Sequence, residues 1–308
     1  ANVSVNNNLH GIYNYSGGGD LAWATGFFLI EGGANVTANN NKQFGIYNSG
    51  DSKTPTNDHF TIQGDAVISA DGNGAHGIYN DGGIFTVETG ATVSACNNSY
   101  YGIFNNKGTF TVENGVDLQV EYNQESGVVN VENSKLTLLS GRVRYNTTKN
   151  FYGYGGGLRN YGEATLSDDV QLYNNHARLA GDDIENGAYA TITFGATGSD
   201  WALDGYPDCY HPIDGWYDDS VNDRWNAHAE HETDLHMVLV EPVTSYTGPL
   251  SLKAAHGPTG TLIVHKQTTG EQLVDDCDAE FTFVLTLDDE TIDTVNDERY
   301  GVRFENGK

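Results

Sequence analysis

Short stretches of alternating apolar and polar residues, separated by Gly and Asn, run through the first two thirds of the chain. A tetrapeptide of the form Gly-Ile-Tyr-Asn begins at Gly11. Intact or degenerate copies begin at Gly45, Gly77, Gly102, Gly127, Gly157 and Asp183, at spacings of 34, 32, 25, 25, 30 and 26 residues. Strict alternation over so few residues predicts short β-strands, and a recurring period predicts a repeat architecture.

Each period holds two more strand-like elements in a constant order. One is typified by Phe85-Thr-Val, and the next by Ala91-Thr-Val-Ser. Three short strands per period predict the coils of a parallel, right-handed β-helix, because strands this short bury their apolar faces only by stacking coil on coil. We therefore expect an all-β chain with about seven coils over residues 1–198, ending in a strand over 191–196.

Gly and Asn close most periods, and both tolerate the left-handed backbone angles that tight corners require. The apolar residue at every second position should point into the bore. The recurrent Asn positions are expected to stack as a ladder of amides along the rod. Since an open end of such a rod would expose unpaired strand edges, the residues after the last coil should include a cap.

Residues 199–258 break the period and are rich in aromatic and acidic side chains. The first hypothesis is a small aromatic core that plugs the end of the rod. The second, compatible with it, is a platform that stacks on sugar rings. The candidate glycan-binding residues are Trp201, Tyr206, Tyr210, Trp216, Tyr217 and Trp225.

The third hypothesis for this segment is a calcium site, since carboxylate oxygens are the ligands that Ca²⁺ prefers. Its candidate ligands are Asp214, Asp218, Asp219 and Asp223, although their spacing does not match an EF-hand loop. No other cofactor is expected.

The chain of 308 residues has 15 Lys and Arg against 42 Asp and Glu, for a net charge of −27. Nucleic-acid binding requires cations that neutralise phosphates, so this charge excludes it as a function. No stretch has the length of continuous apolar sequence needed to span a bilayer. The three cysteines, Cys96, Cys209 and Cys277, permit either a Cys209–Cys277 disulfide or three unpaired thiols.

Residues 259–308 follow a Pro- and Gly-containing boundary and start a different pattern. The stretches Gly260-Thr-Leu-Ile-Val-His-Lys266 and Glu280-Phe-Thr-Phe-Val-Leu-Thr-Leu287 resemble the start of a Cna-B/pilin-type isopeptide domain of Gram-positive surface proteins. The resemblance implies that Lys266 is the isopeptide lysine of a β-sandwich. The partner Asn and acid of that family lie on later strands, so we expect an incomplete sandwich, either in a fragment or completed by another chain.

The repeat region is also similar to those of large cell-wall-anchored proteins of Gram-positive bacteria. Together the resemblances imply an extracellular surface protein, an adhesin or stalk-tip module, that binds a glycan or protein receptor. A self-assembling filament completed by strand donation is one alternative. A β-helical polysaccharide lyase or hydrolase is the other, with Arg159 and Asp183 as a neighbouring pair on successive coils, but no nucleophile–base pair recurs at coil spacing.

Overall fold

The computed structural model describes residues 1–15, 26–50, 58–150, 153–203, 211–222, 224, 237–239, 244–255, 285–287 and 290–292. The chain divides into two compact units, Ala1–Thr259 and Gly260–Lys308. In the second unit, the described residues form one antiparallel pair, β30 (Leu285–Leu287) with β31 (Glu290–Ile292).

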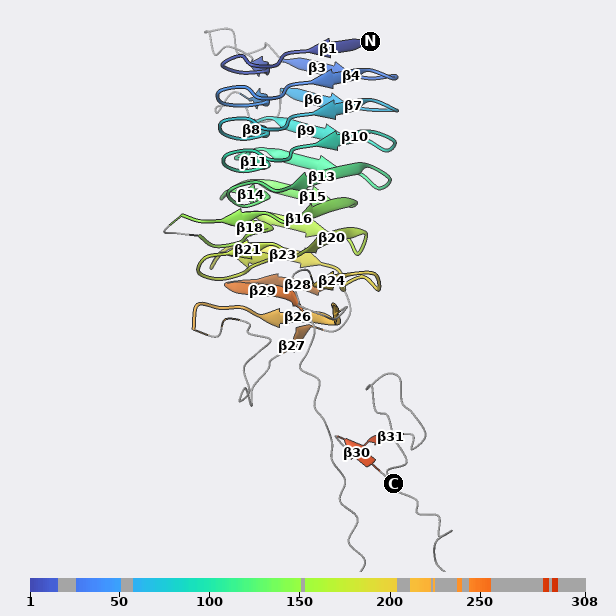
Figure 1. The fold of residues 1–308 in the computed structure, drawn as a ribbon, viewed down its shortest axis with the longest axis vertical. Helices are drawn as coiled ribbons and strands as arrows, with labels where there is room; N and C mark the ends of the chain where they lie inside the picture. The colour runs from blue at the N-terminus through green and yellow to red at the C-terminus, as the bar shows by residue number, and fades with distance from the viewer. Residues whose placement is uncertain are drawn as a thin grey trace, which may run out of the picture. The chain divides into compact units, whose positions relative to one another are not determined.

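The described part of the first unit is a β-solenoid with three parallel sheets of seven solenoid strands each (Figure 1). Sheet A holds β1 (Asn2–Ser4), β4 (Asn35–Thr37), β7 (Val67–Ser69), β10 (Thr92–Ser94), β13 (Asp117–Glu121), β16 (Gly141–Arg144) and β20 (Val170–Tyr173). Sheet B holds β2 (Ile12–Tyr15), β5 (Ile46–Ser49), β8 (Ile78–Asp81), β11 (Ile103–Asn106), β14 (Val128–Asn130), β18 (Leu158–Asn160) and β22 (Ile184–Asn186). Sheet C holds β3 (Phe27–Ile30), β6 (His59–Ile62), β9 (Ile84–Val87), β12 (Thr109–Val112), β15 (Lys135–Leu138), β19 (Glu163–Leu166) and β23 (Thr191–Phe194).

Each coil therefore contributes one strand to every sheet, and the prediction of a parallel β-helix is confirmed. The Gly-Ile-Tyr-Asn copies form sheet B, and copies pair in register, as Ile78 does with Ile46 and Ile103. A minor pair, β17 (Thr147–Thr148) with β21 (His176–Ala177), extends two later coils.

The bore is filled by the apolar residue at every second strand position. Ile78, Phe85 and Val93 are fully buried and typify the three sheets. On sheet C the inward phenylalanines stack coil on coil, with Phe60 and Phe85 centroids 4.7 Å apart and planes within 5°. Because every coil repeats this burial, the core is one continuous column rather than a globular centre.

Two ladders of buried Asn run along the bore, where the sequence predicted one. In the first ladder each side-chain NH2 donates to the side-chain oxygen one coil on, at 2.6–2.8 Å, through Asn14, Asn48, Asn80, Asn105, Asn130, Asn160 and Asn186. In the second the bonds are 2.8–3.2 Å long, through Asn41, Asn73, Asn98, Asn123, Asn146, Asn175 and finally Asp183. The ladders satisfy polar groups that would otherwise be costly to bury.

The corner that precedes the second ladder is left-handed, as its Gly and Asn content predicted. Asn40, Gly72 and Asn97 have φ of 55°, 66° and 57°. In the tetrapeptide itself, Gly is required by space: a Cβ on Gly77 would lie 2.7 Å from Asn98 Nδ2 and 2.8 Å from the Ala70 carbonyl oxygen.

Antiparallel strands cover the C-terminal end of the solenoid. β28 (Thr244–Thr247) pairs with β23, and β29 (Leu250–Ala255) pairs with β22. β26 (Gly215–Asp218) pairs with β29 and with β27 (Met237–Leu239), while β24 (Ala202–Leu203) pairs with β25 (His211–Pro212). These strands occupy the edges that the last coil would otherwise expose.

Strands account for all the regular structure of the described ranges, and no helix there could span a membrane.

Candidate functional site

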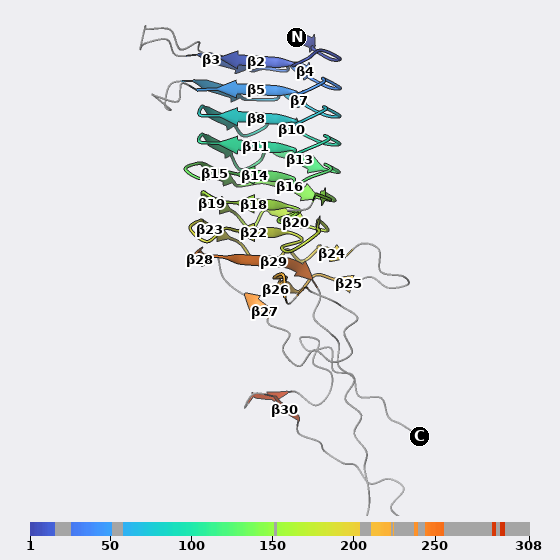
Figure 2. The ribbon, with the colours of Figure 1, turned by 90° about the vertical axis from the view of Figure 1, so that its left-hand side faces the viewer.

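The outer face of sheet B carries aromatic side chains on four successive coils. The tetrapeptide points Ile and Asn inward and the intervening Tyr or Phe outward. Register places Tyr13 beside Tyr47, Tyr47 beside Tyr79 and Tyr79 beside Phe104. Ring centroids along this column are 4.5, 5.0 and 5.0 Å apart. Figure 2 looks onto this face, with β2, β5, β8 and β11 one below another.

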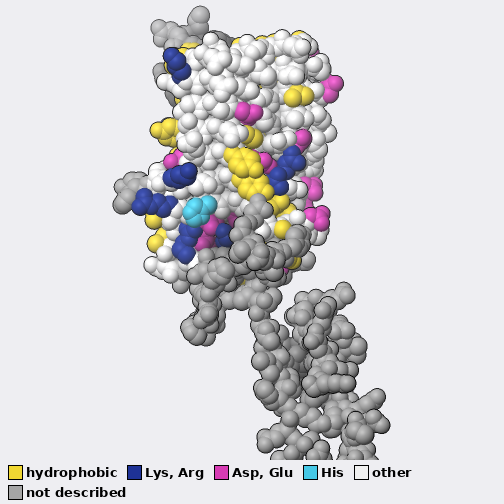
Figure 3. All heavy atoms as spheres, viewed as in Figure 1, with side chains coloured by type: hydrophobic (Ala, Val, Ile, Leu, Met, Phe, Trp, Pro, Cys, Tyr) yellow, Lys and Arg dark blue, Asp and Glu magenta, His cyan; other side chains and the backbone are white. Residues whose placement is uncertain are grey.

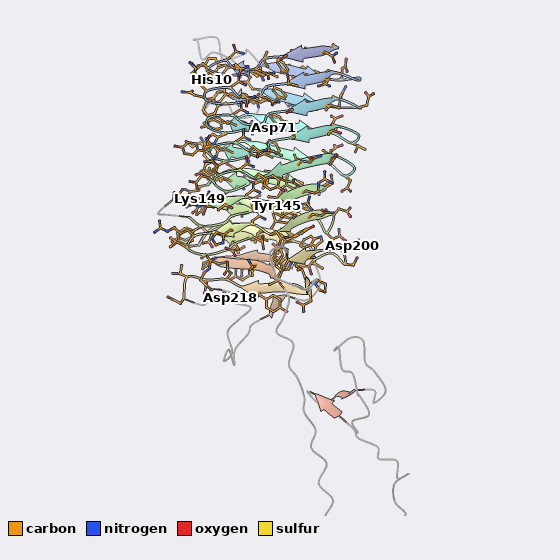
Figure 4. All side chains as sticks on the ribbon, viewed as in Figure 1. His10, Asp71, Tyr145, Lys149, Asp200 and Asp218 are labelled. Carbon is orange, nitrogen blue, oxygen red and sulfur yellow. The ribbon has the colours of Figure 1, made fainter. Side chains whose placement is uncertain are left out.

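A second aromatic column lies beside the first, three residues earlier in each coil. It consists of His10, Phe44, His76 and Tyr101, whose neighbouring centroids are 5.3, 5.5 and 5.0 Å apart. Figure 4 labels His10 at the N-terminal end of the rod. We call the two columns together the aromatic strip, made of His10, Tyr13, Phe44, Tyr47, His76, Tyr79, Tyr101 and Phe104. All eight are half-buried or exposed, and Tyr13 is the most exposed at 51%.

Tyr79 differs from the rest of the strip in orientation. Its plane makes 89° with Tyr47 and 86° with His76, whereas His76 and Tyr101 are within 5° of parallel. None of its contacts with the described rings is face to face. Face-to-face stacking is thus interrupted at Tyr79 in the first column, whereas it continues through the second column.

Polar groups border the strip and hold its hydroxyls. Tyr47 donates its phenolic hydroxyl to Asp81 at 2.9 Å, and Asn106 donates to the same carboxylate at 2.8 Å. Burial, helped by the Asp81 charge, raises the pKa of Tyr47 above its usual value. The Tyr47 phenol therefore stays a neutral hydrogen-bonding group at physiological pH.

A cationic side chain, Arg159, lies beyond the C-terminal end of the strip. Arg159 lies two coils beyond Phe104 in the same outward column. Its guanidinium lies over the Tyr161 ring at 5.1 Å and donates to the Tyr161 hydroxyl, but forms no ion pair with a described residue. The half-buried Glu125 is nearby, accepts a hydrogen bond from Asn150 at 2.8 Å, and has a pKa raised by burial.

A second cluster of chemically active groups lies where the last coil meets the capping strands. Asp182 accepts hydrogen bonds from Arg224 and Lys253, both at 2.5 Å, and His176 lies 3.3 Å away. The fully buried Asp219 pairs with Arg224 Nε at 3.1 Å and accepts the Asp182 backbone N–H. Figure 3 shows the cations gathered toward this end, with a histidine beside them.

The two neighbouring carboxyl groups of this cluster have opposite pKa shifts. Burial alone would raise the pKa of Asp182, but the hydrogen bond from His176 and the charge of Lys253 hold it well below its usual range. Burial raises the pKa of Asp183 to about 7, against the opposing charge of Lys253. Asp183 accepts hydrogen bonds from the Asn175 side chain and the Ala254 backbone N–H, so it joins the Asn ladder to the cap.

Split carboxyl pKa values are typical of acid–base pairs in glycosidases. Here, however, the oxygens of Asp182 and Asp183 are taken by protein donors, and both side chains are buried. The expected pairing of Arg159 with Asp183 is wrong, since the register partner of Arg159 is Glu185 and Asp183 points into the bore. We interpret this cluster as structural, because it attaches the capping strand β29 to the last coil.

The predicted aromatic platform on residues 199–258 is corrected for its three described members. Trp201, Trp216 and Tyr217 are 3–4% exposed. Trp201 stacks on Tyr173 and meets Trp216 edge to face, and Trp216 donates its indole N–H to the Gly195 carbonyl at 3.0 Å. Buried faces cannot stack on sugars, so these rings form the aromatic plug of the first hypothesis. Tyr206, Tyr210 and Trp225 lie outside the described residues.

The predicted calcium ligands are dispersed among protein partners. Asp214 accepts the Tyr217 hydroxyl at 2.7 Å, Asp218 accepts the Ser220 backbone N–H, and Asp219 pairs with Arg224. The described residues contain no group of three or more acidic, His or Cys side chains placed to hold a metal ion. Figure 4 labels Asp218 at the capped end. Asp223 lies outside the described residues, as do Lys266, Cys209 and Cys277, while Cys96 is a free thiol.

Sequence reasoning missed the aromatic strip although its signal was present. The repeated Tyr or Phe after Ile in the tetrapeptide has the opposite parity to the core residues, and an aromatic or His residue precedes the tetrapeptide Gly in each of the first four coils. The outward positions of the tetrapeptide therefore share an aromatic character that is independent of the apolar pattern of the core.

The chain matches none of the protein-family models, curated proteins or solved structures with which it was compared.

Proposed function

We propose that this chain is the carbohydrate-binding part of an extracellular bacterial surface protein, an adhesin or stalk-tip module, and that the aromatic strip is its ligand surface. The strip is the observation that carries the proposal. A contiguous row of aromatic rings that are at least partly exposed at a protein surface is typical of an interaction site. Apolar ring surface bordered by hydroxyl, carboxylate and guanidinium groups matches a sugar, which has apolar C–H faces and a polar rim.

The net charge of the chain argues against polyanionic ligands. At −27 the molecule repels nucleic acids, which are the other common ligands of stacked aromatic surfaces. The acidity comes from a shortage of Lys and Arg, which suits a well-solvated surface that does not aggregate. This composition, together with the resemblance of the repeats to those of cell-wall-anchored proteins, supports placement at the surface of a Gram-positive cell.

The proposal is tested by binding of the full chain to a panel of immobilised neutral and acidic polysaccharides. The double variant Tyr47→Ser/Phe104→Ser should lose at least roughly tenfold in affinity for whichever polysaccharide binds, because contact aromatics dominate such interfaces. The matched control is Tyr189→Ser, which removes a tyrosine that is 95% exposed and outside the strip. Equal binding by the native chain and the double variant would contradict the proposal.

Cleavage of the bound polysaccharide would be a separate function. Asp183, the acid predicted for it, and the neighbouring Asp182 accept hydrogen bonds from protein donors. Incubating each bound polysaccharide with the chain and separating the products by size distinguishes the two: we expect no shortening, and shortened products would replace binding with hydrolysis or elimination as the primary function.

A further inference from the structure

We infer that the strip binds an uncharged linear polysaccharide lengthwise, along the axis of the solenoid, with Tyr79 as the central stacking ring. The inference rests on the proposed function and adds to it the form of the ligand, its charge and its direction. It excludes a single sugar, or the end of a branched glycan, as the ligand.

The lengthwise direction follows from register. Equivalent residues on neighbouring coils face one another without offset, so each strip column runs straight along the rod. Neighbouring parallel strands are about 4.8 Å apart, so four coils present aromatic surface over roughly 14 Å. A surface that repeats the same ring from coil to coil is complementary to a ligand that repeats its own units, and a single sugar would use only a part of it.

Tyr79 is the natural centre because of its orientation. The rings at His76 and Tyr101 are stacked coil on coil and so cover faces of one another. Tyr79 is turned by nearly a right angle to Tyr47 and His76 and is tilted by 57° to Phe104, so it has no face-to-face partner among the described rings. Among the described rings, none therefore lies parallel against a face of Tyr79. Its hydroxyl is kept protonated, since burial raises its pKa.

The charge of the ligand follows from the groups around the strip. Asp81 borders the centre of the strip, and Glu125 stands near its C-terminal end. Arg159 is the single cation beside them in the described part of this outward column, within a chain of net charge −27. A polyanion would meet net repulsion along most of the strip. A neutral polymer instead finds acceptors in the carboxylates and a donor in the guanidinium.

The test is a length series of uncharged oligosaccharides, from monosaccharide to octasaccharide, made from the neutral polysaccharide that binds best in the panel. Affinity should rise with length and level off near the length of the strip, and the monosaccharide should fail to compete. Tyr79→Ala should lose about tenfold or more in affinity for the longest member. Tyr79→Phe should retain most of it, and Tyr189→Ala should equal the native chain.

A second measurement keeps the inference testable if Tyr79→Ala fails to fold. Hydroxyl-radical footprinting of the native chain with the octasaccharide should protect peptides covering β5, β8 and β11 together. Protection confined to one coil, competition by the monosaccharide, or tighter binding of polygalacturonate than of any neutral polymer would each overturn the inference while leaving carbohydrate binding intact. Absence of binding to every glycan would instead remove the proposed function itself.

Discussion

Single residues of the aromatic strip show how a repeated position acquires a special environment. Position 76 corresponds to His10, Phe44 and Tyr101 in the neighbouring coils, so it is an aromatic position that happens to carry an ionisable ring. His76 is stacked between Phe44 and Tyr101, with planes within 13° and 5° of theirs. Its Nδ1 accepts the Tyr101 backbone N–H at 3.4 Å. Burial lowers the pKa of His76 to about 4.

This shift predicts an acid sensitivity that belongs to one residue. An unfolded histidine takes up its proton near pH 6.5, whereas folded His76 resists protonation until about pH 4. Stability contributed by the neutral ring is therefore complete above pH 6.5 and is lost as the pH falls from 6.5 toward 4. His76→Phe should flatten this part of the curve, measured as the unfolding midpoint between pH 7.5 and 4.5. An unchanged slope in the variant would contradict the assignment.

At the scale of elements, the Asn ladders decide how the strands of neighbouring coils are held in register. Asn105 receives a hydrogen bond from Asn80 and donates to Asn130 and to the Gly108 and Lys135 carbonyls. A one-coil slip would keep these pairs, but a one-residue slip would put the amides outside and the outward aromatics in the bore. The ladder thus specifies register as well as satisfying buried polar groups.

The ladder is tested by comparing two adjacent asparagines of β11. Asn105→Ala strands a buried donor of Asn80 and removes several bonds, so it should cost about 3 kcal/mol or more of unfolding free energy. Asn106→Ala removes a half-buried side chain that bonds to Asp81 but belongs to neither ladder, so it should cost under about 1.5 kcal/mol. Both values come from denaturant titration. Equal costs would show that the buried ladder contributes nothing beyond an ordinary surface contact.

At the scale of the first unit, stability depends on how the open end of the solenoid is closed. Strands β28 and β29 approach antiparallel and pair with the last coil, and the Asp182 cluster fastens β29 through Lys253. The Lys253 pKa is raised because Asp182 and its neighbouring acids outweigh the effect of burial. The ionised pair is therefore stable across the ordinary pH range.

Lys253→Met should lower the free energy of local opening of the capping strands more than that of the central coils. Removing one partner of a buried ion pair costs about 3–5 kcal/mol, and the remaining contact of Asp182 with Arg224 favours the lower end. Hydrogen exchange should accelerate in β29 and β22 while β8 and β11 keep their protection. The matched control is Lys135→Met, an exposed lysine on sheet C. Uniform acceleration over all coils would indicate that the unit unfolds as a whole rather than from its end.

The sequence by itself determined the three-strand coil, the inward Ile and Phe, the left-handed corners and an Asn ladder, through the tetrapeptide and the two other strand-like elements of each period. These features are local and repeat, so periodicity and backbone preference suffice to predict them. The tertiary structure decided the rest. The strip exists because register brings together outward rings that are 25 to 34 residues apart in sequence. Trp201 and Trp216 became core because strands from beyond the repeat fold back over the last coil, and sequence patterns carry little information about such distant pairing.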